Sequence, residues 1–167
     1  GFFGVYDLDA DGRSEFVVQS DFAKHVDVLG YREGKLAILW QQEIELDISN
    51  PQKILRVNPN PVVELDGDGR EEVLVNLYNG AGDARWHLTA HDGLSGAPKF
   101  DLPDQILQGV ADLDGDGVVE LLTIEAHNSG IPAYGRIAVW GLVNGEPTVL
   151  WEAQQAAWQT WEPPLPA

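Results

Sequence analysis

Residues 5–18 read VYDLDADGRSEFVV, and closely similar stretches return at residues 62–75 and 110–123. Each copy has the form D-x-D-x-D-G-x-x-E, except that Glu64 replaces the first Asp in the second copy. The first carboxylates, at positions 7, 64 and 112, lie 57 and 48 residues apart (64 − 7 and 112 − 64). A repeat of this length is typical of a four-stranded propeller blade and is longer than a solenoid turn.

Short apolar segments flank each acidic stretch and predict a strand, a loop and a second strand. Between the copies, turn residues such as Glu33-Gly34, Ser95-Gly96 and Asn144-Gly145 separate two further apolar runs, which predicts a second hairpin in each repeat. We therefore expect an all-β fold of about three four-stranded antiparallel β-propeller blades. The expected units are residues 1–50 with the loop 7–15, residues 51–104 with the loop 64–72, residues 105–152 with the loop 112–120, and a Trp- and Pro-rich tail or start of a further segment at 153–167.

A closed propeller has about four to eight blades, so three blades leave two open sheet edges. Open edges tend to pair with other strands. We therefore expect these blades to be part of a larger propeller, completed by further blades or by other chains.

The spacing of the carboxylates predicts calcium loops. Calcium is a hard ion that takes about six to eight oxygen ligands, and carboxylates alternating along one tight loop supply them. A glycine at the sixth position lets each loop turn sharply. The expected ligands are the side chains at positions one, three, five and nine and the backbone carbonyl at position seven: Asp7, Asp9, Asp11, Arg13 and Glu15; Glu64, Asp66, Asp68, Arg70 and Glu72; Asp112, Asp114, Asp116, Val118 and Glu120.

The sequence thus predicts about three calcium ions, whose binding would be coupled to folding because crowded carboxylates repel one another. We expect the second site to be the weakest, because the longer Glu64 side chain must fit the same volume. The loops differ from an EF-hand, since the bidentate Glu that an EF-hand has at position twelve is replaced by Val18, Val75 and Thr123. The alternative is three Asx-rich hairpin turns that bind no metal.

Composition limits the partners. Ten Lys and Arg against 27 Asp and Glu give a net charge of −17, which argues against nucleic acid and anionic membranes as partners. No apolar run approaches the roughly 20 residues of a membrane span, so we expect no membrane insertion. The chain has no Cys, and its four His share no spacing typical of zinc sites or catalytic triads. The sequence therefore identifies no catalytic residue, and enzymatic activity stays open.

Several aromatic and basic residues remain to be placed. We expect Trp40, Trp140 and Trp151 to pack between blades, because they lie in apolar strands. Trp158 and Trp161, in a Pro-flanked tail, are candidates for stacking on carbohydrate. His87 and His91 fall on one face of a strand with Arg85 nearby, which leaves open a patch that recognises a sugar acid.

The three loops between strands, at blade-length spacing, resemble FG-GAP/VCBS-type repeats, which build the integrin α-subunit head and many exported bacterial propellers. The resemblance covers most of the chain, from Phe2 to about Trp151. It implies an extracellular or cell-surface module for adhesion, carbohydrate contact or assembly, with a protein or carbohydrate ligand. Rhamnogalacturonan-type polysaccharide lyases are also similar, being propellers with Asp-rich calcium loops, so a lyase scaffold is one alternative. A structural subunit of an extracellular filament or complex is another.

Overall fold

The computed structural model describes residues 2–20, 25–43, 55–56, 61–80, 82–127 and 134–154. The described residues form strands, turns and loops with no helix, which confirms the expected all-β fold. Within them no helix has the length and apolar character needed to cross a membrane. Trp158 and Trp161 lie outside the described residues.

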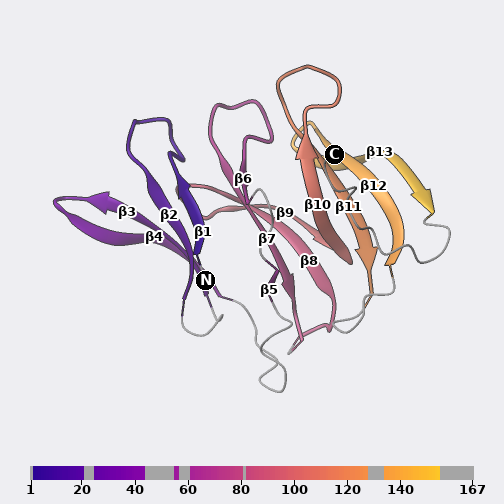
Figure 1. The fold of residues 1–167 in the computed structure, drawn as a ribbon, viewed down its shortest axis with the longest axis horizontal. Coiled ribbons are helices and arrows are strands. Elements are labelled where there is room, and N and C mark those ends of the chain that lie inside the picture. The colour runs from indigo at the N-terminus through magenta and orange to yellow at the C-terminus, as the bar shows by residue number, and fades with distance from the viewer. Residues whose placement is uncertain are drawn as a thin grey trace, which may run out of the picture.

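The described ranges contain thirteen strands in three antiparallel sheets, which we call blade 1 (β1 to β4), blade 2 (β5 to β9) and blade 3 (β10 to β13). Figure 1 shows the blades side by side in chain order, and the described residues do not close them into a ring. The strands are β1 (Phe2–Tyr6), β2 (Glu15–Ser20), β3 (His25–Arg32), β4 (Lys35–Glu43), β5 (Leu55–Arg56), β6 (Val62–Val63), β7 (Glu72–Tyr78), β8 (Trp86–Asp92), β9 (Pro98–Pro103), β10 (Gln105–Ala111), β11 (Glu120–Ala126), β12 (Tyr134–Val143) and β13 (Glu146–Gln154).

Blade 2 differs from the flanking blades in its first strand. In blades 1 and 3 this strand is continuous, with a register shift at Gly4 and at Gly109. In blade 2 it is divided into β5 and β6, which pair with opposite ends of β7. Pro61 precedes β6 and lacks an N–H, but its carbonyl accepts a hydrogen bond from the Leu74 N–H at 2.7 Å. The prediction of four strands is therefore confirmed for blades 1 and 3, whereas blade 2 has its first strand in two pieces.

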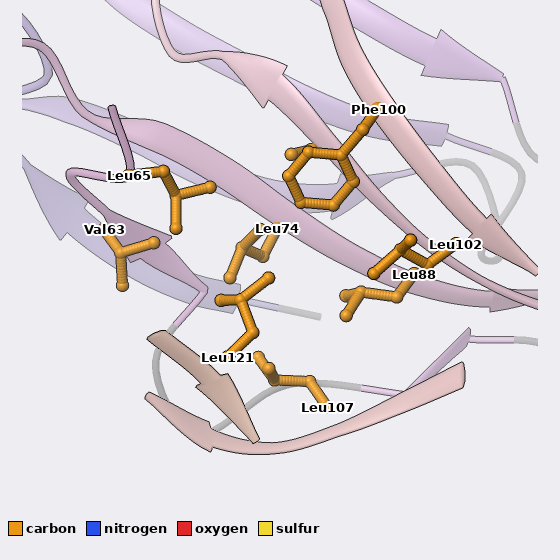
Figure 2. Packing of buried hydrophobic residues seen from close by; sticks show 9 residues of the cluster. Val63, Leu65, Leu74, Leu88, Phe100, Leu102, Leu107 and Leu121 are labelled. Atoms are coloured by element: carbon orange, nitrogen blue, oxygen red, sulfur yellow. The ribbon is translucent and has the colours of Figure 1, made fainter. Parts of the chain in front are cut away.

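The middle strand β7 is buried on both faces, which explains its nearly continuous apolar sequence. Val73 and Val75 face blade 1 and join a cluster with Val17 and Val28. Leu74 points the other way into a second cluster, shown in Figure 2, which includes side chains from blades 2 and 3. Alternation along β7 therefore packs one of its faces against blade 1 and the other against blade 3, in two separate clusters.

The outer faces of blades 1 and 3 are apolar and exposed. Phe16 stands at the repeat position of Val73 and Leu121, which pack against the preceding blade, yet its own side chain is 38% exposed. Leu122 stands at the position of Val17 and Leu74, which pack against the following blade, and it is 39% exposed. Each outer face therefore matches a surface that is covered elsewhere in the molecule.

The cross-strand pairs show which side chains share these faces. In blade 1 the outer face continues from Phe16 through Val5, Leu29 and Ile38, because each of these pairs directly with a neighbour on that face. In blade 3 Leu122 pairs with Val139, and Val139 pairs with Trp151.

The three tryptophans that we expected between blades divide accordingly. Trp40 is buried and Trp140 packs against the cluster between blades 2 and 3. Trp151 is 54% exposed and packs between no two of the described blades, contrary to the prediction. The reason is its cross-strand position, because it lies on the face of the last blade that no described residue covers.

Side-chain hydrogen bonds also join the blades. Asn76 in β7 donates through Nδ2 to the Gln105 carbonyl at 2.9 Å and accepts the Leu107 N–H on Oδ1 at 2.8 Å, so its amide connects blades 2 and 3. Trp40 of blade 1 donates through Nε1 to the Gly93 carbonyl of blade 2 at 2.7 Å. Buried bonds of this kind fix the position of one sheet against the next, because an unpaired buried polar group is costly.

Candidate metal centres

The three acidic loops connect the first and second strands of their blades and project from the same edge of the molecule (Figure 1). Their sixth-position glycines, Gly12, Gly69 and Gly117, have φ of 83°, 80° and 92°, the left-handed conformation that such a turn requires. The fourth position is also left-handed, with Ala10 at φ 56° where the other loops have glycine. The loops thus share one backbone shape, which Ala10 adopts against its preference.

The ninth-position glutamate anchors each loop to the sheet. Glu15, Glu72 and Glu120 are buried at the start of the second strand. In each case one oxygen, Oε2, accepts the N–H of the second loop residue: Leu8 at 3.2 Å, Leu65 at 2.8 Å and Leu113 at 2.7 Å. The other oxygen is left for a cation, because the backbone bond occupies only one side of the carboxylate.

The aspartates at positions three and five hold the turn itself. Position three accepts the N–H of position five at 3.2, 3.3 and 3.1 Å in the three loops. Position five accepts the N–H of position seven at 2.7, 2.8 and 2.8 Å. These two hydrogen bonds recur in all three loops. The motif itself therefore encodes the loop geometry, which does not depend on the neighbouring blade.

The structure brings together three carboxylates in each loop, with ligand atoms within 4.8 Å of one another. The groups are Asp7, Asp9 and Glu15; Glu64, Asp66 and Glu72; and Asp112, Asp114 and Asp116. Three predicted side-chain ligands, Asp11, Asp68 and Glu120, fall outside these groups but lie on the same loops or at their ends. The seventh-position residues Arg13, Arg70 and Val118 are fixed by their N–H groups, and coordination by their carbonyls stays a prediction.

The first loop presents a buried carboxylate oxygen toward its acidic group. Glu15 is fully buried, and its Oε1 has no hydrogen-bond partner among the described residues. The nearest cationic group is the Arg32 guanidinium at 3.6 Å, an ion pair rather than a hydrogen bond. A cation bound in this position would stabilise the buried anionic oxygen.

The second loop already contains a cation that sequence reasoning missed. Lys99 of β9 places Nζ 2.5 Å from Glu72 Oε1, 2.6 Å from Asp66 Oδ2 and 3.9 Å from Asp68 Oδ2. Burial lowers the pKa of the Lys99 ammonium, but its bonds to Asp66 and Glu72 outweigh this and raise the pKa above its ordinary value. Burial likewise raises the pKa of Glu72, and the Lys99 ammonium partly offsets this effect.

A groove of about 390 Å³ opens between the second and third loops. Asp66 borders it on one side, and Asp114, Asp116 and Glu120 border it on the other. Leu150 of β13 lies in the same groove. The groove is therefore strongly acidic and suits cations better than anionic groups.

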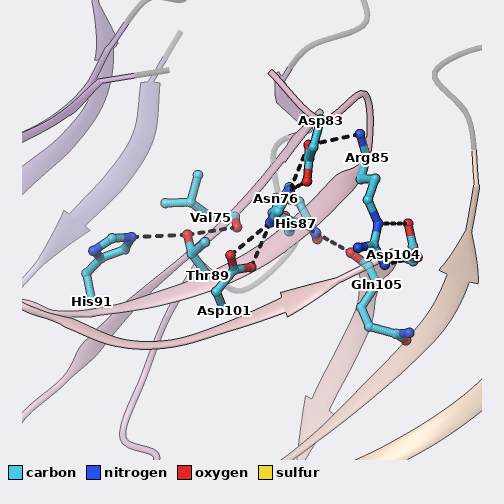
Figure 3. Close-up of polar contacts among 10 residues, drawn as sticks. All are labelled: Val75, Asn76, Asp83, Arg85, His87, Thr89, His91, Asp101, Asp104 and Gln105. Carbon is cyan, nitrogen blue, oxygen red and sulfur yellow. Dashed lines mark hydrogen bonds and ion pairs between the residues drawn. The ribbon is translucent and has the colours of Figure 1, made fainter. Parts of the chain in front are cut away.

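A separate polar cluster lies at the opposite end of blade 2 and is shown in Figure 3. His87 places Nδ1 2.9 Å from Asp101 and Nε2 3.0 Å from Asp83, while the Arg85 guanidinium pairs with Asp104. Burial raises the pKa of the Asp83 carboxyl, but the bond to His87 outweighs it and the pKa falls below its ordinary value.

Both ring nitrogens of His87 face carboxylates, so the ring is engaged within the protein and is not directed toward a ligand. His91, which shares its face, instead stacks on Trp40 with ring centroids 5.7 Å apart. The two histidines therefore have separate structural roles.

Comparison with known proteins identifies the fold but no family. No protein-family model matches the sequence, and no curated protein matches it. Among solved structures, rhamnogalacturonan lyase YesW is similar with a TM-score of 0.55 and 19% identity, over 90% of this chain and 33% of the lyase. The exotype rhamnogalacturonan lyase YesX is similar with a TM-score of 0.50 and 17% identity, over 89% of this chain and 32% of the lyase. The chain thus spans about a third of each lyase, and at these identities the likeness is one of fold.

Proposed function

We propose that this chain is a calcium-binding segment of an extracellular β-propeller, with acidic loops of the FG-GAP/VCBS type, and that it acts as a scaffold. The observation that carries the proposal is the loop geometry. Three carboxylates converge in each loop, and in the first loop the buried Glu15 Oε1 faces them without a hydrogen bond. Hard oxygen donors in a tight turn suit calcium, whereas zinc would call for His or Cys ligands.

Extracellular localisation is part of this proposal, and the calcium concentration outside cells is compatible with it. Calcium sites in extracellular modules have dissociation constants of about 0.1–1 mM, which matches calcium outside cells and not inside them. At a constant of ~0.1 mM and ~1 mM calcium, each filled site would add about 1.4 kcal/mol of stability.

The similarity in fold to two rhamnogalacturonan lyases supports a place in the scaffold of a polysaccharide-lyase-type protein. Fold alone does not carry activity. We propose a scaffold role without lyase activity for this segment, and we expect His87 in particular not to act as the base of a β-elimination, because both of its ring nitrogens are engaged. An ultraviolet assay for unsaturated products on pectic substrates tests this, and an absorbing product would contradict it.

A second role, in assembly, is supported by the two exposed outer faces. Phe16 and Leu122 occupy repeat positions that are buried in the neighbouring blades, so each outer face matches half of a blade-to-blade interface. We propose that further blades, from this protein or another chain, cover them. Exchange of either residue for Lys should lower self-association in sedimentation experiments, and unchanged association would contradict this role.

Calcium titration of the chelator-treated protein by calorimetry tests the main proposal. Glu15→Gln and Asp112→Asn should each remove one binding event, because each loses a carboxylate from one acidic group. Glu43→Gln is the matched control, since it removes the same charge at the exposed end of β4. Absence of calcium binding at millimolar concentration would overturn the proposal.

A further inference from the structure

The fourth strand of every blade carries a one-residue bulge at the same place. In β4 the register passes from Ile38 to Trp40 and leaves Leu39 as the extra residue. In β9 it passes from Pro98 to Phe100 and leaves Lys99, and in β13 it passes from Val149 to Trp151 and leaves Leu150. These three extra residues are therefore structural equivalents.

The bulge residue faces the acidic loop of its own blade. Leu39 and Glu15 Oε1 both lie next to the Cα of Gly30, because a Cβ built there would meet them at 2.9 and 3.3 Å. Leu150 borders the same groove as Asp114, Asp116 and Glu120. Lys99 contacts Asp66 and Glu72 directly. The bulge position thus presents leucine to the loop in blades 1 and 3 and a lysine in blade 2, while the Arg32 guanidinium near Glu15 comes from a different position.

We propose that Lys99 is the built-in cation of the second loop, so that this loop is neutralised without metal and calcium binds there only by displacing the ammonium. The inference rests on the proposed calcium binding of the other two loops. Lys99 bonds to the third- and ninth-position carboxylates, which are two of the three groups that would hold the ion. Calcium would approach the same oxygens to roughly 2.3–2.6 Å, so the two cations exclude each other.

The arrangement makes blade 2 the metal-independent member of the three. Lys99 neutralises carboxylates of its loop, whereas the first and third loops have leucine at the equivalent position. Loss of calcium would then loosen the flanking blades first and leave the middle blade in place.

Reciprocal variants test the proposal in the full chain. Lys99→Leu installs the residue of the other two blades, and Leu150→Lys gives the third loop a cation of its own. Arg136→Gln is the control, because it removes one positive charge from the exposed start of β12, away from the loops. All variants are compared by calcium calorimetry and by thermal unfolding in chelator, with circular dichroism to check the fold.

We expect Lys99→Leu to strengthen calcium binding at one site by about tenfold or more and to lower the unfolding temperature in chelator, since ligand charge sets calcium affinity in such loops. Leu150→Lys should do the opposite, weakening one site and raising the unfolding temperature in chelator. If both variants match Arg136→Gln in both measurements, the proposal is wrong. If no variant binds calcium, the proposed function fails, whereas opposite shifts in chelator would still support Lys99 as the resident cation.

Discussion

The middle blade and the two flanking blades have the same plan but different surroundings. In β7 Val73 and Leu74 are both fully buried, whereas Phe16 and Leu122, at the same repeat positions, are each more than a third exposed. The acidic loops also differ, because only the second meets a lysine. A residue's contribution therefore depends on what lies beside its blade, as expected for repeats that interact with their nearest neighbours.

The largest expected difference in stability is between a buried position in β7 and the equivalent position on the exposed outer face of blade 3. Leu74→Ala should lower the free energy of unfolding by about 2–5 kcal/mol, because it opens a cavity between blades 2 and 3. The equivalent Leu122→Ala should cost less than about 1 kcal/mol, since that side chain is already partly in water. Urea unfolding measures both. Equal costs, measured on this chain alone, would contradict the difference between the buried and the exposed position.

Asn76 tests whether the middle blade is held by polar contacts as well. Asn76→Ala should cost about 1–3 kcal/mol, because the buried Gln105 carbonyl and Leu107 N–H would lose their partner. Gln108→Ala, on β10 beside the residues that Asn76 contacts, is the control and should change stability by no more than about 0.5 kcal/mol, since Gln108 is exposed. Similar small costs for both would show that the amide does not connect the blades.

The first loop can be compared with the third through its fourth position. Ala10→Gly should raise stability by roughly 0.5–1 kcal/mol in chelator, because φ 56° disfavours a side chain. Gly115→Ala is the converse change at φ 82°. An added Cβ would meet no atom within 4 Å there, so backbone strain alone should lower the stability of this variant. Thermal unfolding checks both, and a destabilising Ala10→Gly would contradict the shared loop geometry.

The smallest expected effect is a pH dependence at the contact between blades 1 and 2. Burial lowers the pKa of His91 below its ordinary value of 6.5, although its bond to the Gly96 carbonyl opposes this. The unfolded chain then binds the proton more readily, so the contribution of His91 is present above pH 6.5 and is lost as the pH falls below it. As the pH falls, the stability of His91→Gln should decrease less than that of the wild type, both measured in chelator. The exposed His127→Gln is the control. Identical pH profiles for all three proteins would show that His91 does not contribute.

Much of the fold follows from local pattern. The acidic turns need glycine at position six, and the flanking apolar runs alternate, so hairpins and loops could be predicted at residues 2–20, 61–80 and 105–126. Trp151 could not be placed, because its exposure depends on which face of blade 3 has a neighbour. The divided first strand of blade 2 also depends on pairing along β7, which local pattern does not specify.

Lys99 could not be assigned to the second loop for a related reason. It lies on a strand that is two hairpin connections beyond Glu72, and a bulge turns it toward the carboxylates. A strict two-residue alternation gives no indication of a bulge. The prediction that the second site is weakest rested on Glu64, and Lys99 now provides a more direct physical reason for the same expectation.

The most direct test of calcium stabilisation is thermal unfolding of the intact chain, first in chelator and then in millimolar calcium. If two sites fill readily and Lys99 holds the third, calcium should add about 3 kcal/mol and raise the midpoint by roughly 5–10 °C. Magnesium at the same concentration should do less, because it keeps its water shell. An unchanged midpoint in calcium would contradict the account, leaving the three loops as hydrogen-bonded turns.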